Sequence, residues 1–209
     1  MEEYADAPHM ATEQFEIVDS ELVDELPAPQ IDFSDDPRGA VNMRARFEVP
    51  MDFDHLWTVV TDPDEFTRVF SRTFKGYDDL EVHEDDGAGR RSLEMVREQW
   101  FDMKVWRGSV STHLYLEEDR SEGLIDFRMG RPGFMKVFEG SWQIHQVETP
   151  TGVPLSQVAL YQTLKPSIPG IVPNKAFFIR QFTKKVTEDM VSDLRAEAAR
   201  TREAGHKVC

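Results

Sequence analysis

The chain has 209 residues, 40% of them hydrophobic, which is enough to bury a sizeable core as one domain. No run of about 18 apolar residues occurs, and this excludes a membrane-spanning helix. The only cysteine is Cys209, which excludes intramolecular disulfides and cysteine-based metal sites. We expect no metal and no cofactor. An intracellular setting is expected, with plastid, mitochondrion and cytoplasm all compatible.

The formal net charge of −15 is concentrated near the N-terminus. Residues 1–40 hold 12 Asp and Glu against one basic residue, Arg38, whereas residues 41–209 hold 27 acidic and 23 basic residues. A nucleic-acid partner is not expected, because neutralising phosphates requires a basic footprint. Residues 1–39 are therefore predicted to form an acidic, flexible arm outside a folded domain of residues 40–204. Through this arm the protein could bind a membrane transiently or dock on a protein partner.

The segment AVNMRARFEV (40–49) alternates apolar and polar residues, which predicts a strand with one buried face. Residues 50–70 change to a helical period, with Asp52 as a candidate N-cap. Pro63 interrupts this helix, and a second short helix is expected over residues 64–70.

The next ninety or so residues predict consecutive antiparallel strands joined by short connections. Turn residues such as DDGAG (85–89) and GRPG (130–133) separate them, which favours a meander. The expected strands are 75–84, 91–101, 104–117, 123–130, 134–148 and 155–165.

Three prolines in LKPSIPGIVP (164–173) end the strands, and residues 174–203 then predict one long helix. Its apolar stripe recurs every three or four residues at Ile179, Phe182, Val186, Met190 and Leu194. The predicted fold class is α+β: a curved seven-stranded antiparallel sheet wrapped around a long C-terminal helix, with two short helices after the first strand. Such a sheet and helix commonly leave a cavity between them.

Four segments of the chain carry a resemblance to a known family over about residues 40 to 201. They are PMDFDHLWTVVTDPDEFTRVF (50–70), FKGYDDLEV (74–82), FEGSWQI (138–144) and SQVALYQTLKP (156–166). In combination they resemble the START-like, helix-grip (SRPBCC) superfamily, and within it the polyketide cyclase/dehydrase and coenzyme Q-binding branch. The resemblance implies an internal cavity that binds a hydrophobic molecule such as a lipid, an isoprenoid or a quinone. It does not choose among carrier, sensor, chaperone and cyclase.

The residues that strand and helix periodicity places toward this cavity are the candidate ligand-binding residues. The polar members of the set could hold the polar head of a ligand, or could lie where strand ends open into solvent. The full set is Met95, Arg97, Gln99, Phe127, Met129, Phe138, Gly140, Trp142, Ile144, Leu160, Gln162, Phe178 and Phe182.

Gly140 interrupts the apolar face of its strand, between Phe138 and Trp142. It could let the sheet curl, or it could leave room for a ligand beside Trp142. The second explanation predicts that Gly140→Val weakens ligand binding more than it destabilises the fold.

An enzyme is the alternative hypothesis, namely a polyketide-type cyclase/aromatase or dehydratase acting in the same cavity. Its candidate groups are Arg97, Tyr115 and Tyr161, although no local motif of a nucleophile with its base is present. No residue is therefore assigned a catalytic role. His113 and His145 are predicted to face away from the cavity.

Overall fold

The elements of the computed structural model follow the predicted order closely. They are β1 (Gln30–Asp35), β2 (Val41–Val49), α1 (Phe53–Thr61), α2 (Pro63–Val69), β3 (Phe74–Asp85), β4 (Arg90–Met103), β5 (Trp106–Asp119), β6 (Leu124–Met129), β7 (Met135–Val147), β8 (Leu155–Pro166) and α3 (Lys175–His206). The structure describes residues 26–37, 39–103, 106–150, 152–167 and 175–206.

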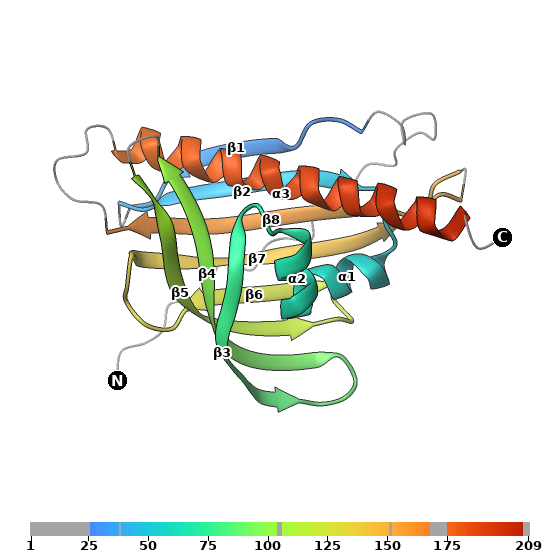
Figure 1. The fold of residues 1–209 in the computed structure, drawn as a ribbon, viewed down its shortest axis with the longest axis horizontal. Coiled ribbons are helices and arrows are strands. Elements are labelled where there is room, and N and C mark those ends of the chain that lie inside the picture. The colour runs from blue at the N-terminus through green and yellow to red at the C-terminus, as the bar shows by residue number, and fades with distance from the viewer. Residues whose placement is uncertain (1–25, 38, 104–105, 151, 168–174, 207–209) are drawn as a thin grey trace.

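In these described residues, the strands form one antiparallel sheet in the order β1-β2-β8-β7-β6-β5-β4-β3. Each strand from β3 to β8 pairs with the next one in the chain, as expected for a meander. Strand β2 pairs with β8 on its other side. Figure 1 shows α3 running lengthwise along one face of the sheet, while β3, β4 and β5 rise steeply near its first turns. The predicted α+β helix-grip architecture is confirmed.

The sheet contains one strand more than the seven expected, because β1 lies within the residues assigned to the acidic arm. Strand β1 pairs with β2 from Gln30 opposite Arg46 to Asp35 opposite Val41. Ile31 and Phe33 pack against the core from this edge strand. Two apolar residues in an acidic, proline-flanked stretch give too weak an alternation to predict a strand. Residues 1–25 of the expected arm lie outside the described residues.

The two short helices begin at the capping residues that the sequence offers. The Asp52 side chain accepts a hydrogen bond from the His55 backbone N–H at 2.8 Å, as expected for an N-cap. Asp62 caps α2 in the same way through the backbone N–H groups of Asp64 and Glu65, at 2.9 and 3.0 Å. None of the helices in the described ranges combines the length and apolarity that crossing a bilayer requires.

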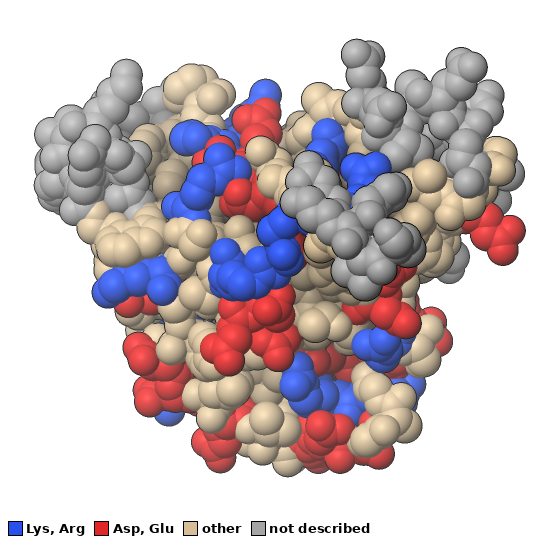
Figure 2. Space-filling view, turned by 45° about the vertical axis from the view of Figure 1, so that its right-hand side comes forward, with Lys and Arg blue, Asp and Glu red and all other residues tan. Residues whose placement is uncertain are grey.

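A buried carboxylate holds α2 against the C-terminal half of α3. Glu197 is 5% exposed, and its carboxylate accepts hydrogen bonds from Arg68 at 2.7 Å and from Arg200 at 2.5 Å. The hydrogen bonds from Arg200 and then Arg68 lower the pKa of Glu197 to about 2. Elsewhere too, acidic and basic side chains lie against one another over much of the face shown in Figure 2.

Strands β7 and β8 approach closely at Gly140. A Cβ added there would overlap the Tyr161 carbonyl oxygen and would lie 2.7 Å from Cζ of Phe127. The room beside Gly140 is therefore taken by the β8 backbone and by the Phe127 ring, not by empty space. The geometry therefore contradicts the room for a ligand at this position, and it gives a reason that neither explanation named, the close packing of β7 against β8 and Phe127.

We predict that Gly140→Ala lowers the free energy of unfolding by about 1–3 kcal/mol, because the new methyl group meets backbone that cannot move aside. Gly76→Ala is the matched control, since no atom lies within 4 Å of a Cβ at that strand position. Urea denaturation measures both variants. Equal losses in the two would contradict the packing role of Gly140.

Glu197→Gln is expected to cost about 1–3 kcal/mol of stability at pH 7, because it leaves Arg68 and Arg200 without their shared carboxylate. The folded-state pKa of Glu197 lies below its unfolded value, so this contribution is present above about pH 4.5. It is lost as the pH falls toward 2. The difference between wild type and variant should therefore shrink in urea titrations at pH 7, 5 and 3.5. Glu188→Gln is the control, since this residue of α3 is 49% exposed, and a pH-independent difference for Glu197→Gln would refute the assignment.

Candidate functional site

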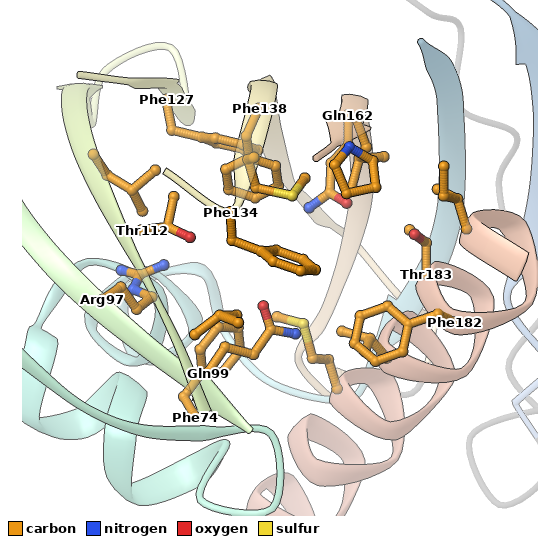
Figure 3. Close-up of a pocket in the computed structure, with 18 of the residues that line it drawn as sticks. Phe74, Arg97, Gln99, Thr112, Phe127, Phe134, Phe138, Gln162, Phe182 and Thr183 are labelled. Atoms are coloured by element: carbon orange, nitrogen blue, oxygen red, sulfur yellow. The ribbon is translucent and has the colours of Figure 1, made fainter. Parts of the chain in front are cut away.

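A cavity of about 130 Å³ lies between the first half of α3 and the concave face of the sheet. Its wall comes from β3 to β8, from α1 and α2, and from α3 residues up to Met190. Pro166 and Ile179 line both this cavity and a neighbouring pocket beside the β1–β2 connection, so the two spaces adjoin. Figure 3 shows side chains from these elements converging on one space.

Eight of the thirteen candidate ligand-binding residues line the cavity. Strand alternation places the six strand residues on the concave face, and helical spacing places the other two on the buried side of α3. The eight are Arg97, Gln99, Phe127, Phe138, Trp142, Gln162, Phe178 and Phe182.

The other five candidates lie outside the cavity wall. Met95, Ile144 and Leu160 are each 1% exposed and belong to the packed core. They share the face of the cavity residues, but alternation predicts the face and not the position along the strand. Gly140 lies beneath the Phe127 ring, and Met129 is the last residue of β6.

Several cavity residues are not among the candidates, although some have a sequence signal. Thr112 alternates with Leu114 and Leu116 on β5, and Thr183 lies one helical turn after Ile179 on α3. Phe134 shares the parity of Phe138 in the expected strand 134–148, although β7 begins only at Met135. The remaining additions are Val60, Phe66, Phe74, Val110, Leu114, Leu116, Ile125, Met135, Leu164, Pro166, Ile179, Val186 and Met190.

Arg97 is the positively charged side chain in the wall of this cavity. Its guanidinium carbon lies 3.9 Å from the centre of the Phe66 ring and 5.7 Å from that of Phe74, which is cation–π geometry. Burial disfavours the charged form and lowers the pKa of Arg97 to about 10. The side chain is therefore still charged at neutral pH. Part of its surface remains accessible because it faces the cavity.

Four neutral polar side chains accompany Arg97 in two places. Thr112 is directly opposite Arg97 in the β4–β5 register, and Gln99 is the next residue on the same face of β4. Gln162 and Thr183 lie on the other side of the cavity, and Phe134 points between the two groups (Figure 3). The site can therefore offer hydrogen bonds at two ends of an aromatic space.

Neither tyrosine considered for catalysis reaches the cavity. Tyr115 lies on the opposite face of the sheet, where its hydrogen bond to Glu94 raises the pKa of its hydroxyl group. The Tyr161 hydroxyl group lies 3.2 Å from the Thr163 hydroxyl group, away from the cavity wall. Both residues alternate with cavity or core residues, so their strand positions turn them outward.

His113 also lies outside the cavity, but it is not a simple surface residue. Its side chain is 11% exposed and contacts Glu94 through Nε2. Gly130 leaves room for the imidazole ring, since an added Cβ there would overlap it. Among the described residues, no group of three or more His, Cys, Asp or Glu side chains has the geometry to hold a metal ion.

Solved structures with the same fold come from several bacteria. The chain is similar to TTHA0849 from Thermus thermophilus, with 18% identity over 77% of this chain and 98% of that chain and a TM-score of 0.56. For the Zhui aromatase/cyclase from a Streptomyces species the identity is 15%, over 76% and 93% of the two chains, with a TM-score of 0.54. A START superfamily protein from Mycobacterium smegmatis has 14% identity over 78% and 99%, with a TM-score of 0.55. At these identities the likeness shows the START-like fold alone.

No curated protein matches the chain. One family model matches residues 31–148, which is more than half of the chain and runs from β1 to the end of β7. The protein therefore belongs to the family described as Domain of unknown function DUF220.

Proposed function

We propose that this protein binds an apolar small molecule in the cavity between α3 and the sheet, as a carrier, sensor or chaperone. The lining of the cavity carries the proposal. Aromatic and aliphatic side chains make up most of the wall, and five polar side chains interrupt it. Ligand sites in proteins have this composition, with a few polar groups that orient the ligand.

The size of the cavity favours a compact ligand. Its volume of about 130 Å³ is close to that of an engineered cavity of about 150 Å³ that binds benzene. Among the lipids, isoprenoids and quinones that the family resemblance implies, molecules with one ring fit this space. A long acyl chain requires the wall to open further.

The wall can open at Phe134. This side chain is 42% exposed, it follows the GRPG connection between β6 and β7, and its ring points into the cavity (Figure 3). A ligand that takes its place gains contacts with Phe138 and Phe182 on either side of the space. Burying a ring in this way contributes about 1.5–3 kcal/mol.

A cyclase/aromatase or dehydratase that uses the same cavity is the second candidate function. The likeness in fold to the Zhui aromatase/cyclase supports it, as does the grouping of Arg97, Gln99 and Thr112. These side chains could stabilise negative charge that develops on a carbonyl oxygen. Turnover of a linear polyketide-like chain that Arg97→Met abolishes would favour the enzyme over the carrier.

The acidic arm is proposed to dock on a protein partner or, transiently, on a membrane. A deletion that separates the arm from ligand binding should end at residue 25, because removing residues 1–38 also removes β1 and exposes the edge of β2. We expect the deletion of residues 1–25 to leave ligand affinity within about twofold of wild type, since no described cavity residue precedes Val60. Isothermal titration calorimetry checks this. A larger loss would assign the arm a direct part in ligand binding.

Phe182→Ala is expected to weaken the binding of trans-cinnamamide, a neutral single-ring probe, by about fivefold or more, because one aromatic wall is lost. Phe177→Ala is the matched control on the same helix, since Phe177 is 58% exposed and does not line the cavity. Isothermal titration calorimetry measures the affinities. Equal affinities for wild type and Phe182→Ala would contradict the proposed site.

A further inference from the structure

Arg97 differs from Arg68 and Arg91 in the groups that its guanidinium contacts. Arg68 and Arg91 each donate hydrogen bonds to a carboxylate, at 2.7 Å to Glu197 and 2.9 Å to Glu118. Among the described residues, no carboxylate oxygen lies within 4.0 Å of the Arg97 guanidinium. Its contacts are the rings of Phe66 and Phe74, and the sulfur of Met95 at 3.7 Å. The fold thus places a cation in the wall of an apolar cavity without an anionic partner.

A charge in such surroundings is costly unless an opposite charge compensates it. The Phe66 and Phe74 rings recover part of the cost through cation–π attraction, but among the described residues the only protein acceptor that the guanidinium N–H groups reach is the Met95 sulfur, a weak one. Glu118 acts only at a distance, because its carboxylate is already engaged by Arg91. A ligand that brings a carboxylate into the cavity would supply the missing partner.

The side chains beside Arg97 suit a carboxylate in particular. Thr112 lies opposite Arg97, and Gln99 follows it on the same face of β4. A hydroxyl group and an amide can each donate a hydrogen bond, while neither carries a charge that would repel an anion. A planar guanidinium with neutral donors at its side matches the two oxygens of a carboxylate.

We propose that the cavity binds a small ring-bearing organic acid, with its carboxylate on Arg97 and its ring among the aromatic side chains near Phe134, Phe138 and Phe182. The inference rests on the proposed function, since it names the class of ligand for the same cavity. The volume of about 130 Å³ restricts the acid to about one ring with a short substituent. Gln162 and Thr183, across the cavity, can bond a second oxygen of such a ligand.

The test compares two probes of nearly the same shape, one charged and one neutral. Both trans-cinnamate, which is ionised at neutral pH, and its neutral amide trans-cinnamamide are titrated into the full-length protein by isothermal titration calorimetry. The same titrations use Arg97→Met, which keeps the length of the side chain without its charge, and Arg128→Met. Arg128 is the matched control, because its guanidinium also lies over an aromatic ring, that of Tyr115 at 5.6 Å, but is 62% exposed outside the cavity.

We expect wild type and Arg128→Met to bind cinnamate at least about tenfold more tightly than cinnamamide, as a charge-assisted contact requires. Arg97→Met should lose this preference and bind cinnamate no more tightly than cinnamamide. Equal affinities of wild type for cinnamate and cinnamamide would overturn the proposal that the ligand is an acid, and the cavity would remain an apolar binding site. A preference that persists in Arg97→Met would also overturn it. Failure of wild type to bind either probe would overturn the proposed function together with this inference.

Discussion

One long helix covers most of the concave face of the sheet, with the short helices α1 and α2 beside it, and this constraint sets the position of the cavity. Eight strands at about 4.8 Å spacing span roughly 35 Å, whereas a helix with its side chains is about 10–12 Å wide. The sheet therefore has to curl around α3, and β3 to β5 rise beside its first turns (Figure 1). What the helix cannot fill is lined by large side chains and remains as a cavity.

The two halves of α3 contact different parts of the molecule: the C-terminal half packs in the core, and the N-terminal half lines the cavity. The C-terminal half carries Leu194 and Ala198 into the core and holds α2 through Glu197. The N-terminal half instead presents Phe178, Phe182 and Val186 to the cavity. Because the helix is fixed at one end by packing and ion pairs, the other end can border a space that a ligand fills. The bound molecule would then complete the packing that the protein leaves unfinished.

Arg97 differs from the charged side chains on the outer face of the sheet in the partners that it contacts. On the outer face, carboxylates, histidines and tyrosines pair with one another, as Glu94 does with His113 and Tyr115. On the inner face, Arg97 faces a cavity wall of aromatic rings and neutral polar groups. Arg91 and Glu118 pair with each other on this inner face, whereas among the described residues Arg97 has no carboxylate within 4.0 Å.

Strand alternation is enough to predict the fold and the face of most cavity residues, because a period of two fixes which side chains share a face. It cannot predict depth, so it assigns Met95 and Leu160 to the cavity although they lie in the packed core. It places Phe134 on the face of Phe138 in the expected strand 134–148, but it cannot predict that β7 begins at Met135 with a register shift before Val137. The sequence shows that a glycine interrupts the apolar face of this strand at residue 140. Only the close approach of the β8 backbone explains why a side chain is not tolerated there.

The central claim is that the space between α3 and the sheet is a ligand site. Mass spectrometry of small molecules released from the purified full-length protein tests it most directly, with Thr183→Trp as a comparison that fills the cavity. Wild type is expected to release a ring-bearing organic acid, and Thr183→Trp is expected to release none. Identical small molecules from both proteins, or an empty wild type that binds no apolar probe, would contradict it.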